Sequence, residues 1–336
     1  MKTIKTSIKI GASPQTVWSI MDDLRQYPAW NKLTPDLSGR TTVGSVVRGT
    51  LVKPATPPIP ISPTISAIVG ARELRWLTDV PGFRAEHFFL LKPTSDGGTE
   101  LIHGEDFDGA AIAARWEGIQ ATSPPAFDGL NRDLKRRAEE LESATVMLHP
   151  AVGEGAAPSA SAASTTLKCL CVEDQVQVRL TRPIYHNHLC GCTKCWKPAG
   201  ALFAQTAVVS RDGLEVIANR QKLRIVDATQ SIQRHACREC GAHVYGDVQD
   251  VNHHFYGICF VHPELAADGS CGAPEFAGFV SSLIESGTSP SLMEAVRRQL
   301  NGLGIPAFDG FSPELMDVIA WHRRKLLLDP ATGEPG

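Results

Sequence analysis

The first half of the chain contains no cysteine, because all nine cysteines of the 336 residues lie at or beyond Cys169. No stretch approaches the roughly 18 apolar residues of a membrane span, and residues 1–15 lack the continuous apolar core of a signal peptide. There is also no long run of Lys or Arg, and the formal net charge is -3, which argues against a nucleic-acid or membrane surface. These absences favour a cytoplasmic location, where clustered cysteines bind metal or act in catalysis more often than they form disulfides.

The uneven distribution of cysteine divides the chain into two parts of different chemistry. A length of 336 residues suits about two domains. Residues 151–165 are small and polar without apolar periodicity, which is typical of a linker. We therefore predict a first domain over residues 1–147, a linker over 148–166 and a second domain over 167–330.

The first domain has the pattern of an α+β fold. Residues 3–10 alternate as a strand, and Ser13-Pro14 supplies an N-cap and a first-turn proline for a helix that should end before Pro28. Further strands are expected over residues 45–52, 64–69, 73–78, 86–91 and 99–107. Asp96-Gly97-Gly98 suits the turn before the last strand, and the apolar spacing predicts a long final helix over residues 125–143.

A strand, a helix, an antiparallel series and a long final helix form a helix-grip arrangement. Residues 12–18, 27–31 and 129–135 of this segment resemble the START-like superfamily of polyketide cyclases and lipid-transfer domains. The resemblance implies an apolar cavity under the long helix and a small apolar ligand. It identifies no catalytic residue: His87, His103, Glu105 and Asp106 are interpreted as surface or satisfied core positions. The proline-rich residues 54–63 are interpreted as a structured loop.

Seven cysteines of the second domain fall into three tight groups. The groups are Cys169 with Cys171, Cys190 with Cys192 and Cys195, and Cys237 with Cys240. Seven thiols exceed one tetrahedral zinc site and are one short of two closed sites, so four plus three is the natural division. The two pairs would form a closed site, and the triplet would leave one coordination position open. Other groupings stay open from spacing alone: Cys195 could join a pair, or a nearby histidine (His186, His188, His235 or His243) could be a ligand.

Charge indicates what an open three-cysteine site would bind. Zinc with three thiolates has a formal charge of about -1, so it activates water weakly. Zinc suits sulfur ligands and deprotonates a coordinated thiol. The sequence therefore favours capture of an incoming thiol as a thiolate that attacks a reactive electrophile such as a small aldehyde.

Longer motifs around the cysteines resemble the glutathione-dependent formaldehyde-activating enzymes, a zinc family shared with centromere protein V. The motifs are residues 188–203, 223–228, 232–237, 255–257 and 276–287, within a match from about Leu148 to Leu327. The resemblance implies a structural zinc on Cys169, Cys171, Cys237 and Cys240, and a catalytic zinc on Cys190, Cys192 and Cys195. It also implies a mainly-β domain with helices toward the C-terminus, which the apolar spacing places at residues 292–300 and 313–326.

The chain departs from this family at two positions. Leu170 stands where the family has histidine, and Cys259 stands where the family has aspartate. Cys259 and Cys271 are isolated from the clusters and are interpreted as buried or free thiols. Lys194 and Lys197 are candidates to bind the glutathione carboxylates, whereas Trp196 is interpreted as a packing residue.

The leading hypothesis is zinc-dependent addition of glutathione to formaldehyde, giving S-(hydroxymethyl)glutathione, with two zinc ions per chain. This makes the protein a carbon–sulfur lyase with glutathione and formaldehyde, or another small electrophile, as partners. No side chain is assigned as the general acid. Alternatives are a glutathione or thiol carrier, a thiol lyase or transferase that acts on an apolar metabolite held by the first domain, and a zinc-scaffolded interaction module.

Overall fold

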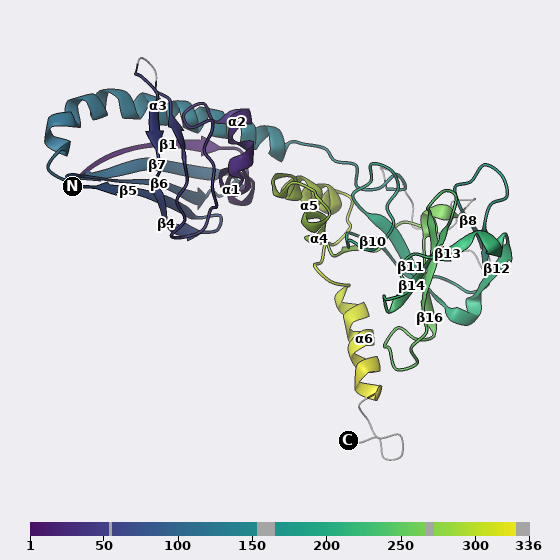
Figure 1. Cartoon of the computed structure of the whole chain (residues 1–336). Helices are drawn as coiled ribbons and strands as arrows, with labels where there is room; N and C mark the ends of the chain where they lie inside the picture. Colours follow the sequence, from purple (N-terminus) through teal and green to yellow (C-terminus); the bar gives the residue numbers. More distant parts are fainter. Residues whose placement is uncertain (54–55, 153–164, 267–271, 327–336) are drawn as a thin grey trace. The chain divides into compact units, whose positions relative to one another are not determined.

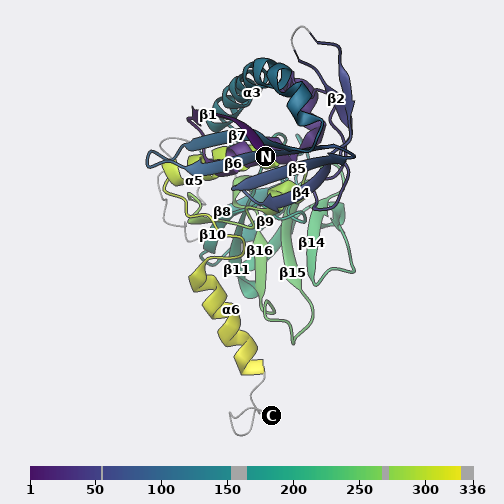
Figure 2. The same cartoon turned by 90° about the vertical axis from the view of Figure 1, so that its left-hand side faces the viewer.

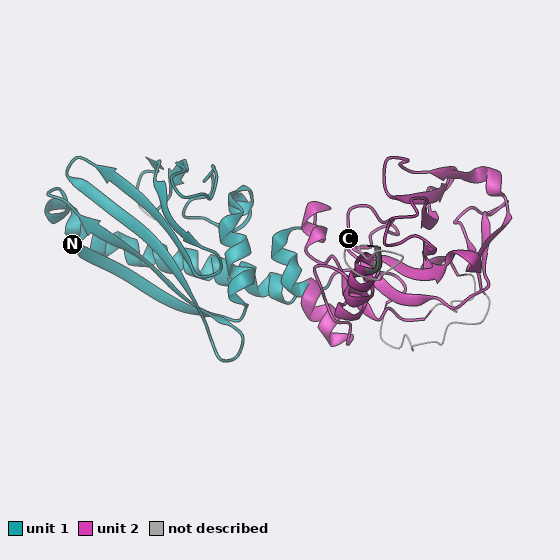
Figure 3. Cartoon of the chain, turned by 90° about the horizontal axis from the view of Figure 1, so that it is seen from below, with its two compact units in different colours: residues 1–145, 289–295 teal, residues 146–288, 296–336 magenta. Residues whose placement is uncertain are grey.

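The computed structural model describes residues 1–53, 56–152, 165–266 and 272–326. The chain divides into two compact units, one over Met1–Thr145 with Ser289–Ala295, the other over Val146–Thr288 with Val296–Gly336 (Figure 3). Within the described residues, no helix combines the length and the apolar character needed to cross a membrane.

The first unit is an antiparallel sheet with one long helix. Its strands are β1 (Lys2–Ile10), β2 (Gly49–Leu51), β3 (Ile59–Ile61), β4 (Thr64–Val69), β5 (Glu73–Val80), β6 (Phe83–Pro93) and β7 (Thr99–Asp108), and its helices are α1 (Pro14–Asp22), α2 (Tyr27–Trp30) and α3 (Ile112–Glu142). A short 3-10 turn, Leu24–Gln26, joins α1 to α2. The main sheet has the order β1-β7-β6-β5-β4, and α3 lies over one of its faces (Figures 1 and 2). This is the α+β helix-grip fold that the sequence predicted.

Local sequence signals account for several of these elements. The Ser13 hydroxyl accepts a hydrogen bond from the Thr16 N–H and caps α1. The strand predicted over residues 64–69 has the same bounds in the structure. Gly97 has φ +84° at the predicted turn, a conformation that glycine adopts without a steric penalty.

The start of the long helix was predicted wrongly. We expected it at Pro125 from the apolar spacing, but α3 begins at Ile112 and contains Pro124 and Pro125 in its interior. Each interior proline removes one backbone hydrogen bond. The first half of the helix is held by tertiary packing instead: Ile112 is buried, and the Trp116 ring contacts Phe107 of β7 edge-to-face.

The structure shortens one expected strand. The strand expected over residues 45–52 is reduced to Gly49–Leu51, which pairs with Ile59–Ile61 inside the proline-rich segment. The first helix ends at Asp22, before Pro28 as expected, and Pro28 lies in the separate short helix α2. Isolated bridges from Val46 to Thr64 and from Arg48 to Ser38 replace the rest of the expected strand.

The second unit is mainly β, as the sequence predicted. Its strands are β8 (Thr165–Lys168), β9 (Gln177–Leu180), β10 (Tyr185–Cys190), β11 (Ala204–Ser210), β12 (Leu214–Ala218), β13 (Leu223–Ile225), β14 (Ile232–Cys237), β15 (His243–Val248), β16 (Ile258–Val261) and β17 (Phe276–Gly278). They form one sheet ordered β13-β14-β15-β16-β11-β10-β17 and a second ordered β12-β9-β8. Three helices follow: α4 (Ser282–Glu285), α5 (Met293–Gly302) and α6 (Pro313–Leu326). The last two lie at the predicted positions.

The chain near the expected linker packs within the second unit. Leu148 is buried, and its carbonyl accepts a hydrogen bond from the Phe203 N–H at 3.0 Å. Residues 153–164 of the expected linker lie outside the described residues. The segment Ser289–Ala295, which belongs to the first unit, was not foreseen from the sequence: its Leu292 packs against the core of that unit.

Candidate metal centre

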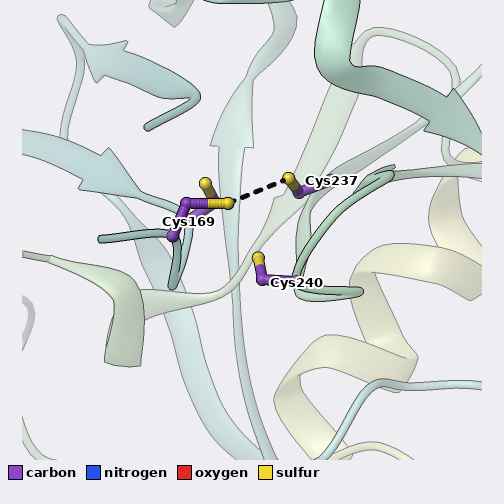
Figure 4. Close-up of side chains that lie close together, drawn as sticks. Cys169, Cys237 and Cys240 are labelled. Atoms are coloured by element: carbon purple, nitrogen blue, oxygen red, sulfur yellow. Dashed lines mark hydrogen bonds between the residues drawn. The ribbon is translucent and has the colours of Figure 1, made fainter. Parts of the chain in front are cut away.

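The two cysteine pairs come together in one cluster. The four sulfur atoms of Cys169, Cys171, Cys237 and Cys240 lie within 4.8 Å of one another. Figure 4 shows the side chains of three of them turned toward a common centre. Cys169 and Cys171 lie just after β8 rather than on a strand, and Cys237 ends β14.

The backbone of the Cys237–Cys240 turn favours metal binding by the four-cysteine cluster. The Gly241 N–H donates to the Cys237 carbonyl, and Gly241 has φ +73°, which favours glycine. Burial raises the pKa of the Cys237 thiol, but backbone N–H groups of Cys240 and Glu239 outweigh this and lower the pKa to about 7. A thiol of low pKa is readily available as a thiolate ligand.

The remaining three cysteines form a second cluster. The sulfur atoms of Cys190, Cys192 and Cys195 also lie within 4.8 Å of one another, at the end of β10 and in the loop that follows. The Gly191 N–H donates to the Gly278 carbonyl, and a Cβ at Gly191 would clash with the Phe279 carbonyl oxygen. Only glycine therefore fits where this loop crosses the chain after β17.

Hydrogen bonding within the triplet favours a thiolate at its centre. Bonds from Cys190 and Cys195 lower the pKa of the Cys192 thiol to about 2. The bond to Cys192 raises the pKa of Cys190 well above its ordinary range. A cation bound by the three sulfurs would stabilise their thiolate forms.

Both clusters fit zinc. A regular tetrahedral site with Zn–S distances of about 2.3 Å places its sulfurs about 3.8 Å apart, and the Sγ atoms of Cys171 and Cys237 lie 3.6 Å apart. The first cluster offers four thiol ligands, which is a closed set. The second offers three, and no histidine, aspartate or glutamate of the described residues joins them at ligand distance.

A cavity of about 250 Å³ opens beside the three-cysteine cluster. Its walls are mainly aromatic and apolar, with a few polar groups. It is lined by His188, Cys190, Cys192, Cys195, Thr206, Ile232, Arg234, Tyr245, Gly246, Phe255, Phe260, His262, Phe279 and Phe311. The Thr206 hydroxyl is buried and, among the described residues, has no hydrogen-bond partner. Such an atom is normally satisfied in proteins, so this hydroxyl is available to hydrogen-bond a molecule that enters the cavity.

The cationic side chain in the wall is Arg234, which the sequence analysis did not single out. Neither Lys194 nor Lys197 lines the cavity. The Lys197 ammonium donates to the Gly191 carbonyl at 3.2 Å and to the Ser286 hydroxyl at 3.4 Å, and Lys194 is exposed. Arg234 lies on β14, three residues before Cys237, and no local motif distinguishes it from the other arginines.

His262 of the cavity wall pairs with a buried carboxylate behind it, and this pair was missed from the sequence. His262 Nδ1 lies 3.2 Å from Oε1 of Glu264, whose side chain is 7% exposed. His149 Nε2 approaches the same oxygen at 3.8 Å. Burial raises the pKa of Glu264, but His262 and His149 more than offset this and lower it to about 2. Glu264 is thus a carboxylate that fixes the His262 ring and leaves Nε2 to face other groups.

The other histidines near the cysteines have different surroundings. The His188 ring stacks on Phe276, and its Nδ1 lies 2.7 Å from the His186 carbonyl, so this nitrogen carries the proton. Burial lowers the pKa of His188 to about 4, which keeps its ring neutral. His235 pairs with Asp247 at 3.1 Å, away from the cavity lining, and His243 is half-buried on β15.

Two of the remaining sequence interpretations concern single cysteines. Cys259 is buried on β16 opposite Asp247 and does not line the cavity. Burial, with the nearby Asp247, raises its pKa to about 12. Cys271 lies outside the described residues. Trp196 packs against the core of the unit and contacts the His262 ring edge-to-face.

Comparison with known proteins gives the class of each unit. Residues 164–273 match the family model "Glutathione-dependent formaldehyde-activating enzyme", and residues 1–139 match "Polyketide cyclase / dehydrase and lipid transport". The chain belongs to the glutathione-dependent formaldehyde-activating enzyme family through its C-terminal half, to which the first unit adds a START-like domain.

A curated relative supports the family assignment of the C-terminal half. A Podospora anserina protein named "Putative glutathione-dependent formaldehyde-activating enzyme" is 50% identical over 182 residues, which cover 54% of this chain and 85% of that protein. Among solved structures, the ZhuI aromatase/cyclase from Streptomyces sp. R1128 is 15% identical, with TM-score 0.36, over 41% of this chain and 94% of its own. TTHA0849 from Thermus thermophilus is also 15% identical, with TM-score 0.34, over 41% of this chain and 97% of its own.

Proposed function

We propose that the second unit adds glutathione to formaldehyde and releases S-(hydroxymethyl)glutathione. The family membership supports glutathione-dependent formaldehyde activation. The observation that carries the proposal is the three-cysteine cluster in the wall of a cavity, because it combines an incomplete ligand set with space for a substrate.

Each cluster would hold one zinc ion, giving two per chain. Cys169, Cys171, Cys237 and Cys240 would hold a structural ion, because four thiolates leave no free position. Cys190, Cys192 and Cys195 would hold the second. When bound there, zinc would lower the pKa of an incoming thiol so that it reacts as a thiolate.

His262 supplies the proton exchange that the reaction requires. Its Nδ1–H donates to the Glu264 carboxylate, so Nε2 can accept the proton of the glutathione thiol. The thiolate sulfur attacks the aldehyde carbon, the C–S bond forms, and the carbonyl electron pair moves to oxygen. The same proton then passes from Nε2 to that oxygen. No external acid or base is consumed.

Two other groups of the wall have roles that follow from their chemistry. The unpartnered Thr206 hydroxyl can donate to the aldehyde oxygen as its charge develops. Arg234 can bind a glutathione carboxylate, and a guanidinium forms paired hydrogen bonds with such a group. Lys194 and Lys197 remain candidate carboxylate contacts outside the cavity lining.

The proposal is tested by following adduct formation directly. Zinc-loaded full-length protein is mixed with glutathione and formaldehyde, and the hydroxymethyl product is monitored by NMR against the uncatalysed reaction. We expect acceleration that is proportional to protein concentration. Tight glutathione binding without acceleration would overturn the enzymatic proposal in favour of a thiol carrier.

A further inference from the structure

The cavity beside the three-cysteine cluster is much larger than formaldehyde requires. Its volume is about 250 Å³, on a scale where one water needs roughly 10–15 Å³. Formaldehyde is little larger than water, so most of this space serves a larger group, which belongs either to glutathione or to the electrophile. The chemistry of the wall distinguishes these two occupants.

One side of the wall is a continuous series of aromatic rings. The Phe255 ring contacts Phe260 edge-to-face at 5.1 Å between centroids and Phe311 at 6.0 Å, and Phe311 contacts Phe279 at 5.0 Å. The series starts at the cysteine cluster, because the backbone of Phe279 lies against Gly191. Three of the rings, Phe260, Phe279 and Phe311, are only half-buried, so they keep apolar surface available to a ligand in the cavity.

The charges of the wall do not match glutathione along its whole length. Among the described residues, no aspartate or glutamate lines the cavity, so the glutathione ammonium would have no counter-charge there. Its peptide groups would lose hydrogen bonds to water if they lay against the phenylalanines, which costs free energy. Arg234 lies close enough to Cys195 for their charges to interact. Glutathione can therefore occupy this polar side through its thiol and one carboxylate, which leaves the aromatic side to the electrophile.

We propose that the aromatic wall, made of Phe255, Phe260, Phe279 and Phe311, binds the apolar body of an aldehyde larger than formaldehyde. The inference rests on the proposed addition of glutathione and specifies its substrate class. The atoms balance as they do for formaldehyde. The glutathione sulfur forms a bond with the aldehyde carbon, the carbonyl electron pair moves to oxygen, and the thiol proton ends on that oxygen to give a thiohemiacetal.

Hydrocinnamaldehyde and acetaldehyde test the substrate class because they share the aldehyde group and differ by a benzyl substituent. Zinc-loaded full-length protein is mixed with glutathione and each aldehyde, and exchange NMR measures thiohemiacetal formation above the uncatalysed rate. We expect kcat/KM for hydrocinnamaldehyde to exceed that for acetaldehyde by about tenfold to 100-fold, the effect of burying one aromatic group.

Two substitutions of one ring locate the contact. Phe260→Asn replaces the ring with a polar amide and should lower the ratio of the two kcat/KM values by about tenfold. Phe260→Leu keeps an apolar side chain and should retain most of the ratio. Tyr185→Asn changes an exposed aromatic residue outside the cavity lining and is the matched control. Because both aldehydes are measured on the same protein, partial loss of zinc or of folded protein does not alter the ratio.

An unreactive analogue measures the contact without turnover. Hydrocinnamyl alcohol should bind the full-length protein in titration calorimetry, at least about tenfold more weakly in Phe260→Asn. Catalysis with formaldehyde but no preference for hydrocinnamaldehyde over acetaldehyde would overturn this inference and leave the proposed function standing. No acceleration with any aldehyde would overturn both. Alcohol binding that is insensitive to Phe260→Asn would contradict the aromatic wall as the binding surface.

Discussion

His262 Nδ1 lies 3.2 Å from Oε1 of the buried Glu264 carboxylate, in the wall of the cavity that also contains the three-cysteine cluster. The two residues are only two positions apart, at the end of β16 and in the turn that follows. In the proposed reaction, this fixed imidazole would supply the acid–base group that the cysteines cannot. The pair would then couple proton transfer to the thiol bound at the three-cysteine cluster.

Removing the imidazole should slow turnover more than it weakens binding. His262→Asn should lower kcat by about 100-fold or more, the usual contribution of a general acid–base group. KM for glutathione should change little, because His262 moves a proton and does not bind the tripeptide. Glu264→Gln should lower kcat by a smaller factor, because Glu264 acts through His262. Steady-state kinetics with His87→Gln as the matched control measures both, and a wild-type kcat in His262→Asn would exclude the proton role.

Arg234 and the two loop lysines should differ in their effect on glutathione binding. Arg234→Gln removes a charged hydrogen bond worth about 1.5–3 kcal/mol, which corresponds to a rise in KM of about 10–100-fold. Lys194→Gln should have little effect, because its side chain is exposed and solvent screens it. Measuring KM for glutathione in Arg234→Gln and Lys194→Gln shows which of the two side chains binds the carboxylate. A larger rise in KM for Lys194→Gln than for Arg234→Gln would show that Lys194, and not Arg234, binds the glutathione carboxylate.

The two cysteine clusters should respond differently to substitution. Cys240→Ser opens the closed site, so we expect loss of one zinc and of cooperative unfolding of the second unit, since such ions contribute directly to folding. Cys259→Ser, which changes a buried thiol outside both clusters, should keep both ions. Metal analysis and thermal unfolding provide the measurement. Two zinc ions in Cys240→Ser would contradict the closed four-thiolate site.

The buried His103 predicts how acid affects the first unit. Its pKa is lowered by burial, so below about pH 6.5 the unfolded chain binds a proton that the folded chain does not. The free energy of unfolding should therefore decrease as the pH falls from about 7 to about 5, by up to about 1.4 kcal/mol per pH unit from this group. Denaturant titrations of wild type and His103→Gln measure the difference. The variant should lose less stability over this range, and an equal loss in both proteins would show that His103 does not contribute.

The sequence predicts those parts of this protein that depend on local patterns. β4 and α6 have the predicted bounds because their apolar periodicity is uninterrupted. The three cysteine groups could be recognised in the sequence because metal ligands often occur as closely spaced pairs or triplets. The start of α3 was missed because packing of Ile112 and Trp116 outweighs the local effect of two prolines.

The cavity wall could not be assembled from local patterns. Phe255, Phe279 and Phe311 come from separate segments that only the folded unit brings together. In the sequence, nothing distinguishes His262 and Glu264 from other polar residues near the end of a strand. His149, which approaches the same carboxylate, lies more than 100 positions earlier in the chain. His87 and His103 were interpreted as surface or satisfied core positions, and their contact at 2.7 Å joins two strands that no local pattern pairs at these residues.

We propose that the three-cysteine cluster activates glutathione, whereas the four-cysteine cluster stabilises the fold. The rate of adduct formation by full-length Cys192→Ala, with one zinc retained, tests it most directly. We predict the uncatalysed rate together with a wild-type unfolding midpoint, because only the reactive site is lost. A wild-type rate in this folded variant would show that the three-cysteine cluster does not activate glutathione.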